Sequence, residues 1–269
     1  EVLEREIMNH LFPDTTYGCE SGGDPKNIPD LTYENFLNFH RTYYHPSNSY
    51  IYLYGNMDME EKLAFLDEHY LSHFDYLDVD SVIQEQKAFG ACRDVTLEYP
   101  VAENEGEEDN TYLSYNMVVG NAADSQMAMA FEVLDYALLS APGAPLKQAL
   151  LDVKAGKDVY GSYDDGILQP YFTVIAKGSN PDRKEEFVSV IRQVLGDIVK
   201  NGIDRKAVEA GINYFEFRYR EADFSSYPKG LMYSLDILGD WLYEKGNPFA
   251  QVQQLTVFEK LKKAVNEGY

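Results

Sequence analysis

The stretch from Ser21 to Asn56 has the sequence SGGDPKNIPDLTYENFLNFHRTYYHPSNSYIYLYGN and predicts, in order, a turn, a helix, a second turn and a strand. Thr32 is a favourable N-cap, and the aromatic residues that follow it recur at helical spacing. The helix is expected to end before Pro46, because a residue that precedes proline is disfavoured in the α conformation. Ser49–Tyr54 has the aromatic and β-branched composition that favours a strand.

The composition predicts a soluble globular protein, since 45% of the 269 residues are hydrophobic and 14% are aromatic. No apolar run approaches the roughly 20 residues that a membrane-spanning helix needs, so no membrane partner is expected. The net charge of −22 argues against a nucleic-acid partner, because phosphate binding depends on clustered lysines and arginines. This charge either keeps the surface soluble or attracts basic ligands. Cys19 and Cys92 match no disulfide framework or metal motif, which favours a reducing compartment.

Hydrophobic periodicity and capping residues locate the other elements along the chain. Helices are expected at residues 1–11, 58–73, 124–139, 146–153, 181–201, 204–220, 229–244 and 256–266, and strands at 95–99, 111–119, 159–163 and 171–177. The acidic tract Glu103–Asp109 is interpreted as the hairpin loop between the first two of these strands, and Asp164-Asp165-Gly166 as the turn between the last two. Strand pairs followed by long helices predict an α+β fold in which antiparallel sheets are covered by helices.

The hydrophobic pattern loosens over residues 75–94, which we interpret as a linker between domains. Residues 1–74 are then the C-terminal part of a first α/β domain, and residues 95–269 are a second α+β domain. The chain opens without methionine on an amphipathic helix, which suggests that it begins inside a domain. Both domains place a strand before a helix, so we expect one fold present as a partial and a near-complete copy.

The histidines are the first candidates for a metal or catalytic site, because His69 and His73 are four residues apart on a predicted helix and face a common point. A zinc-peptidase helix also needs a glutamate, as in H-E-x-x-H or H-x-x-E-H, whereas the residues between these histidines are tyrosine, leucine and serine. A surface or capping role is the alternative, as it is for His40 and His45, which lie on different helical faces. No G-x-S-x-G or G-x-G-x-x-G motif occurs. We therefore assign no catalytic residue and no metal ligand to this chain.

The stretch from residue 21 to 56 resembles the region that follows the active site in the presequence-protease branch of the pitrilysin/insulinase zinc peptidases. The resemblance rests on the S-G-G-D-P turn, I-P-x-L-T at the helix start, F-H-x-x-Y-Y-H-P-S-N, and a strand ending in Y-G-N. It continues in LLSAPGAPLKQAL at residues 138–150, VYGSYDDG at residues 159–166 and EADFSSYPKGL at residues 221–231. Together these segments extend the resemblance over almost the whole chain.

The resemblance implies a LuxS/pitrilysin-like sandwich and an enzyme whose two half-shells enclose a chamber that degrades unfolded peptides. The family's H-x-x-E-H zinc motif and its further glutamate ligand have no counterpart here, so zinc is expected in the full-length enzyme and none in this chain. In the family, the second domain carries a Gly/Pro loop and an adjoining edge strand that anchor the peptide by strand addition. The matching residues are the expected substrate-binding site: Ala141, Pro142, Gly143, Ala144, Pro145 and Leu146, with the strand Val159–Tyr163 beside them.

A physical reason supports this assignment, because residues without bulky side chains let a peptide backbone approach and pair with an open strand edge. A tight connection between two helices is the alternative interpretation of residues 141–146. The family pattern has Gly-Pro followed by a serine-like residue, whereas this chain has Pro142-Gly143-Ala144.

We therefore expect a catalytically inactive fragment of a zinc metalloendopeptidase that contributes chamber wall and peptide anchoring. Its expected partners are unfolded peptides and the remaining domains of the same polypeptide. The expected location is the bacterial cytoplasm, with an organellar matrix as the alternative. Two other functions stay open: a non-catalytic scaffold subunit of the same fold, and a stand-alone peptide- or carbohydrate-binding module.

Overall fold

The computed structural model describes residues 1–222, 224–243, 248–249 and 251–269. They fall into two compact units, which we call the sheet unit and the helical unit. The sheet unit comprises Glu1–Gly18, Glu85–Asp223 and Gln253–Tyr269, and the helical unit comprises Cys19–Gln84 and Phe224–Val252. Each of these units joins segments that are distant in sequence. The domain boundaries predicted at residues 74 and 95 instead divide the chain into consecutive segments, and they stay a prediction.

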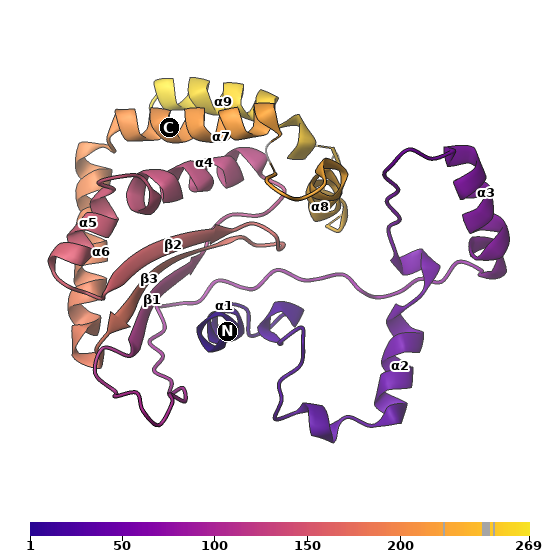
Figure 1. Cartoon of the computed structure of the whole chain (residues 1–269), viewed down its shortest axis with the longest axis horizontal. Helices are drawn as coiled ribbons and strands as arrows, with labels where there is room; N and C mark the ends of the chain where they lie inside the picture. Colours follow the sequence, from indigo (N-terminus) through magenta and orange to yellow (C-terminus); the bar gives the residue numbers. More distant parts are fainter. Residues whose placement is uncertain (223, 244–247, 250) are drawn as a thin grey trace. The chain divides into compact units, whose positions relative to one another are not determined.

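A three-stranded antiparallel sheet with the strand order β1-β3-β2 belongs to the sheet unit (Figure 1). Strand β1 spans Thr111–Val118, β2 spans Asp158–Asp164 and β3 spans Tyr171–Ser179. Strands β2 and β3 form the predicted hairpin, in which Gly161 is paired with Val174, and β1 pairs with the other side of β3. This antiparallel sheet with its covering helices confirms the predicted α+β class.

Five helices of the sheet unit lie on one side of the sheet (Figure 1). They are α4 (Ser125–Asp135), α5 (Pro145–Asp152), α6 (Lys184–Asn201), α7 (Arg205–Glu221) and α9 (Gln254–Asn266). One hydrophobic core lies between the sheet and the helices α5 and α6, where Leu150 and Ile191 pack with the strand residue Val174. A second core joins α4 to α7 and α9 around the buried ring of Phe258.

Local capping explains where these helices begin and end. The carboxylate of Asp124 accepts a hydrogen bond from the N–H of Met127, and that of Asp204 accepts one from the N–H of Lys206. These bonds satisfy N–H groups that have no partner within the helix. Gly202 follows α6 with φ +88°, a left-handed conformation that favours glycine. The helix ends predicted at these residues are confirmed.

Helix α1, Val2–Leu11, lies against the opposite face of the sheet (Figure 1). It buries Ile7, and Phe12 just beyond its end is 0% exposed. The ring of Phe12 contacts that of Tyr171 on β3, with the centroids 6.1 Å apart. Tyr171 faces α1 while Phe172 belongs to the core on the other side, as the alternation of side chains along a strand requires. The helix predicted at the start of the chain is confirmed.

The helical unit contains α2 (Tyr33–Tyr43), α3 (Met59–His69) and α8 (Lys229–Trp241). The predicted N-caps are confirmed, because Thr32 accepts a hydrogen bond from the N–H of Asn35 and Asp58 accepts one from the N–H of Glu61. The helix predicted to reach Glu244 ends at residue 241 in the structure, and Glu244 lies outside the described residues. Among the described residues, no helix combines the length and the apolar composition that crossing a membrane requires.

The strand predicted at Ser49–Tyr54 is wrong, because these residues pair with no strand among the described residues. Their aromatic rings pack against α8 instead. The rings of Tyr50 and Trp241 have centroids 4.6 Å apart, and the missing side chain of Gly230 leaves room for the ring of Tyr54. A strand-like composition describes side chains that fit a pleated surface, and it yields a strand only where a partner strand is available.

The strand predicted at residues 95–99 is also wrong, and so is the hairpin predicted across the acidic tract. Strand β1 pairs with β3, which is distant in sequence, instead of with the segment just before it. Tyr99 still lies beside the start of β1, where its hydroxyl donates to the carbonyl of Asn110 and its ring contacts Tyr112. Neighbouring segments are the usual partners in a hairpin, whereas β1 pairs with the distant β3, and both strands contribute side chains to the core beneath the helices.

Glu216 on α7 connects this helix to α9 through a small network of charges. Its carboxylate accepts hydrogen bonds from Lys262 on α9 and from Arg220, whose Nη2 lies 2.6 Å away. These two cations, Lys262 first, lower the pKa of the Glu216 carboxyl below its ordinary value of 4.5. A lowered pKa means that the network stabilises the fold at a pH above that ordinary value, and that this contribution is lost as the pH falls through the folded-state pKa.

Replacing Glu216 with glutamine is expected to lower the free energy of unfolding by about 1 kcal/mol at pH 7 and by less at pH 3, because the wild-type carboxyl takes up its proton as the pH falls through its lowered pKa. Urea denaturation at the two pH values measures the difference. Glu209→Gln removes an exposed pair with Arg205 on the same helix and is the matched control, with an expected change below about 0.5 kcal/mol. An equal loss for Glu216→Gln at both pH values would contradict a role for the ionised carboxylate.

Candidate peptide-anchoring site

The loop Ala141–Leu146 connects the end of α4 to α5. Helix α4 continues beyond Asp135 as a single π turn, Tyr136–Ser140, in which the N–H of Ala141 donates to the carbonyl of Tyr136 over 2.7 Å. The helix predicted for residues 124–139 is therefore an α-helix that closes with one wider turn. Such turns occur often at functional positions.

The loop itself makes a tight turn between Ala141 and Ala144. The N–H of Ala144 donates to the carbonyl of Ala141 over 3.0 Å, and Gly143 has φ +75°. Proline at the second position and a left-handed glycine at the third are typical of a type II turn. No neighbouring heavy atom lies within 4 Å of the place where a Cβ of Gly143 would stand. The turn thus requires glycine for its backbone conformation, and it leaves open space beside the main chain.

The six predicted site residues divide into two groups by burial. Ala144 and Leu146 are 4% and 1% exposed, and Leu146 packs in the core beneath the helices. The members of the other group are half-buried or exposed: Ala141, Pro142, Gly143 and Pro145. The buried pair therefore holds the loop on the core, while the other four present small side chains and backbone at the surface.

Strand β2 forms one edge of the sheet. It pairs with β3 along one side, and its other side pairs with no strand in the described part of the chain. The π turn Tyr136–Ser140 and helix α5, which the loop connects, both contact β2. The unpaired N–H and C=O groups of an edge strand can pair with another extended chain. The loop and the edge strand, which the sequence predicts as one binding site, thus belong to contacting elements of the same unit.

Gly161 in the middle of β2 allows the π turn to lie close against the strand. A Cβ at this position would stand 2.2 Å from Cδ1 of Leu139 and 2.8 Å from Oδ1 of Asp135. Leu139 is 1% exposed and has no free space to move into. Glycine is therefore required by the close approach of a neighbouring element.

Asp135 and Ser140 form a contact at this place that sequence reasoning missed. The hydroxyl of Ser140 donates to Oδ2 of Asp135 over 3.0 Å, while Oδ1 is buried without a hydrogen-bond partner among the described residues. Burial raises the pKa of the Asp135 carboxyl, and the bond from Ser140 partly opposes this shift. The sequence holds no motif for the pair, since residues five apart lie on different faces of an α-helix and meet here only because of the π turn.

Negative charge gathers at the C-terminal end of β2. Burial raises the pKa of the Tyr163 phenol, and surrounding carboxylates, Asp165 first, raise it further. The Tyr163 ring is stacked on Phe131, with the centroids 5.5 Å apart. Asp164 accepts a hydrogen bond from the N–H of Gly166, which confirms the predicted turn. Tyr163 therefore stays neutral at physiological pH beside several carboxylates.

The histidines singled out in the sequence make packing and capping contacts. The ring of His69 packs edge-on against Phe65, with the centroids 4.5 Å apart. Nδ1 of His45 accepts a hydrogen bond from the N–H of Ser47 and so caps the turn after α2, instead of bonding the last carbonyls of that helix. Within the described ranges, no three residues of the types His, Cys, Asp and Glu come together as a group that can hold a metal ion.

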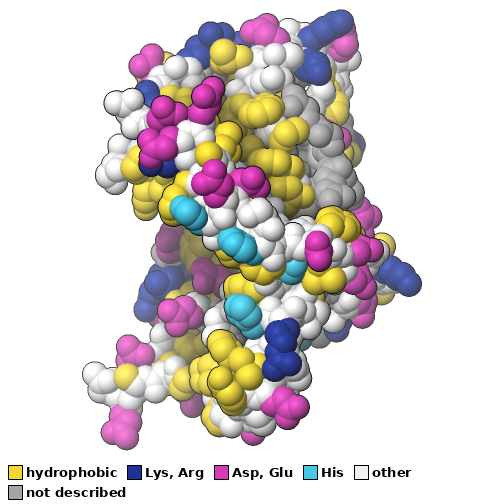
Figure 2. Space-filling model, turned by 90° about the vertical axis from the view of Figure 1, so that its right-hand side faces the viewer, with side chains coloured by type: hydrophobic (Ala, Val, Ile, Leu, Met, Phe, Trp, Pro, Cys, Tyr) yellow, Lys and Arg dark blue, Asp and Glu magenta, His cyan; other side chains and the backbone are white. Residues whose placement is uncertain are grey.

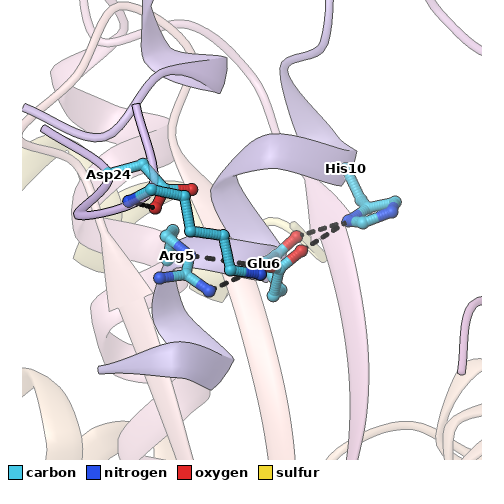
Figure 3. A network of polar contacts seen from close by, with 5 residues as sticks. Arg5, Glu6, His10 and Asp24 are labelled. Atoms are coloured by element: carbon cyan, nitrogen blue, oxygen red, sulfur yellow. Dashed lines mark hydrogen bonds and ion pairs between the residues drawn. The ribbon is translucent and has the colours of Figure 1, made fainter. Parts of the chain in front are cut away.

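A second group of titratable side chains lies on α1, where Glu6 stands between Arg5 and His10 (Figure 3). The Glu6 carboxylate accepts hydrogen bonds from Nε and Nη2 of Arg5 over 3.2 and 3.1 Å. Nδ1 of His10 lies 2.8 Å from the Glu6 carbonyl oxygen and 3.8 Å from its carboxylate. These contacts lie within one helix and orient its side chains, and they offer one carboxylate and one imidazole, too few donors for a zinc site.

A comparison with known protein families identifies the family of this chain. The sequence profile described as the peptidase M16 inactive domain matches residues 30–215. The chain belongs to the M16 peptidase family. The zinc-peptidase resemblance noted in the sequence is thereby confirmed, and the matched M16 region contains the loop Ala141–Leu146 and strand β2.

Two relatives extend the similarity over the whole chain. The chain is 45% identical over 268 residues to the protein HypA of Clostridium perfringens, and the match covers 100% of this chain and 27% of HypA. It is 34% identical over 270 residues to presequence protease 1, chloroplastic/mitochondrial, of Arabidopsis thaliana, and the match covers 99% of this chain and 25% of that protein. The chain thus spans about a quarter of the length of these relatives.

Two solved structures share the fold. A peptidase M16 inactive domain from Pseudomonas fluorescens superimposes with a TM-score of 0.64 at 19% identity, covering 99% of this chain and 62% of that one. A protease from Helicobacter pylori gives a TM-score of 0.58 at 16% identity, covering 99% of this chain and 68% of that one. At these identities the similarity shows the M16 fold, in agreement with the antiparallel sheet and its covering helices.

Proposed function

We propose that this chain forms part of the chamber wall and the peptide-anchoring surface of a longer zinc-dependent M16 endopeptidase, and that the chain alone is catalytically inactive. The observation that carries the proposal is the open edge of β2 beside the loop Ala141–Leu146. Membership of the M16 family, together with relatives named presequence proteases, supports peptides as the substrate class.

An extended, unfolded peptide binds in this proposal by adding a strand to β2. Its main-chain N–H and C=O groups pair with the edge of the strand, so affinity depends little on the peptide's sequence. Pro142 and Gly143 present small surfaces at the adjoining turn, which lets the peptide backbone approach closely. A folded protein offers no free extended segment, so the surface selects unfolded chains.

The negative charge of the chain favours basic peptides. The net charge of −22 produces a field that attracts cations over several ångströms. Near the edge strand, Asp164 and Asp165 add local negative charge. We therefore propose that basic peptides associate faster than acidic ones and that salt reduces this preference. The same charge disfavours a nucleic-acid partner.

Zinc is assigned to another part of the longer polypeptide. Peptide hydrolysis by this family of enzymes needs a zinc ion that polarises the scissile carbonyl and a glutamate that moves the proton. The described residues of this chain bring together no donor set for such an ion. We therefore derive no catalytic step from this chain, and its proposed contribution is to bind and orient the peptide.

The remaining domains of the same polypeptide are the proposed partners of the helical unit. None of the side chains of residues 19–84 is buried, and Phe36 and Phe39 on α2 are 65% and 59% exposed. Figure 2 shows hydrophobic side chains exposed on one face of the molecule. Burial of one such side chain contributes about 1.5–3 kcal/mol, so a segment with none buried lacks the core of an independent domain. This argues against a stand-alone binding module.

A cytoplasmic location in a bacterium is proposed from the similarity to HypA of Clostridium perfringens. An organellar matrix is the alternative, because other relatives are named as mitochondrial or as chloroplastic and mitochondrial presequence proteases.

The test uses the full-length polypeptide that contains this chain, with a long unstructured fluorogenic peptide as substrate. Cleavage that a zinc chelator abolishes is the expected result. The variant Pro142→Trp places a large ring on the exposed turn and is expected to raise KM about tenfold while kcat stays within about twofold, because it removes anchoring and leaves the zinc chemistry in place. Steady-state kinetics measure both parameters.

Pro100→Trp is the matched control, because Pro100 is an exposed proline outside the proposed site. It is expected to leave both kinetic parameters unchanged. A Pro142→Trp variant with an unchanged KM would contradict the anchoring role of the loop. A full-length protein without chelator-sensitive cleavage would favour the second candidate, a non-catalytic scaffold subunit.

A further inference from the structure

Asp135 lies where helix α4, the loop and strand β2 meet. Its Oδ2 accepts the hydrogen bond from Ser140, the last residue before the loop, over 3.0 Å. Its Oδ1 lies beside Gly161 in the middle of β2, because a Cβ on that glycine would stand 2.8 Å from this oxygen. One oxygen of this carboxylate thus contacts the residue before the loop, and the other lies beside the edge strand.

The surroundings of Asp135 give it no evident role in stability. Oδ1 is buried without a hydrogen-bond partner among the described residues, while the neighbouring Leu138 and Leu139 are buried apolar side chains. A buried acceptor without a partner disfavours the folded state, and native proteins contain few of them. An apolar side chain would pack at this contact without that cost. Stability therefore does not explain why a carboxylate is present at residue 135.

The geometry of the π turn offers an explanation for this carboxylate. It holds Ser140 within hydrogen-bonding distance of Asp135, although residues at this spacing point in different directions on an α-helix. Without the bond from Ser140, only the main-chain bond from Ala141 to Tyr136 opposes relaxation of the turn toward regular α-helical geometry. Such a change rotates the residues that follow, so Pro142 and Gly143 would shift relative to β2.

We propose that Asp135 is a positioning residue for peptide binding. It accepts the hydrogen bond from Ser140 and lies against Gly161, and in this way it fixes the position of the Pro142–Gly143 turn relative to the open edge of β2. The inference rests on the proposed function and adds a residue to it. A peptide that is bound by the loop and the edge strand together needs this spacing, whereas a peptide too short to pair along the strand and contact the loop does not.

The experiment compares two substrates in the full-length protein: a peptide of about 20 residues, and one of about five residues that spans at most about 18 Å. Asp135→Ala and Ser140→Ala are each expected to raise KM for the long peptide about fivefold, with kcat within about twofold and no change for the short one. Asp135→Asn keeps an acceptor for Ser140 and is expected to restore KM to near the wild-type value. The double variant Asp135→Ala/Ser140→Ala is expected to match the single ones, because both remove the same contact.

Asp152→Ala is the matched control, since Asp152 accepts a hydrogen bond from Gln148 within α5 and lies outside the loop. It is expected to leave KM unchanged for both peptides. If Asp135→Ala does not fold, Ser140→Ala carries the same test. An equal rise in KM for both peptides would show a merely structural role and overturn the inference. A rise with Pro142→Trp but none with Asp135→Ala and Ser140→Ala would overturn the inference alone, and no rise with any of the three would overturn the proposed function as well.

Discussion

Replacing Gly161 with alanine is expected to lower the free energy of unfolding by about 2–3 kcal/mol. The added Cβ would stand 2.2 Å from Cδ1 of Leu139 and 3.1 Å from the carbonyl oxygen of Thr173. Leu139 is buried, and the carbonyl belongs to the neighbouring strand, so neither can withdraw without disturbing the sheet or the core. Urea denaturation followed by circular dichroism measures the loss.

Gly196→Ala is the matched control for this variant. Gly196 lies inside α6, and no neighbouring heavy atom stands within 4 Å of its added Cβ. Alanine is favoured over glycine in a helix interior by about 0.5–1 kcal/mol, so this variant is expected to be more stable than the wild type. A Gly161→Ala protein as stable as the wild type would contradict the close contact between β2 and the π turn.

Replacing Phe187 with alanine is expected to cost about 3–5 kcal/mol of folding free energy, the largest effect among the substitutions considered. Phe187 is 1% exposed on α6 and belongs to the core between the helices and the sheet. Removing its ring leaves a cavity that the surrounding side chains fill only in part. Because domains are stable by about 5–15 kcal/mol in total, the variant is expected to be partly unfolded at 37 °C, which thermal denaturation measures.

Val199→Ala on the same helix is the control for Phe187→Ala. Val199 is 88% exposed, so its truncation is expected to change the free energy of unfolding by less than about 0.5 kcal/mol. A similar loss of unfolding free energy in the two variants would contradict the placement of Phe187 on the core-facing side of α6.

The helices were predictable because their signals are local. Asp58, Asp124 and Asp204 each accept a hydrogen bond from an N–H in the first turn of the helix that follows. Gly202 ends α6 with its left-handed backbone. A cap needs only residues within a few positions of itself, so a single stretch of sequence contains all the information.

The strands were harder to predict, because a strand exists only together with its partner. Ser49–Tyr54 has the composition of a strand but packs its rings against α8. The sequence predicts a strand at Thr111–Val118 but the wrong partner for it, since it pairs with Tyr171–Ser179, many residues later in the chain. The hairpin of β2 and β3 was predictable, because its two strands are joined by a short connection with a clear turn at Asp164-Asp165-Gly166.

The sequence by itself determined the positions of the helices, the α+β class and the resemblance to the M16 peptidases, because each depends on the order and spacing of neighbouring residues. It also located the loop Ala141–Leu146 through its small residues. Only the tertiary structure decided that one edge of β2 has no strand partner in the part of the chain that the structure describes, that Ala144 and Leu146 are buried, and that Ser140 meets Asp135. Burial, strand pairing and the contacts across a π turn depend on how the chain folds back on itself, and no local pattern of residues encodes them.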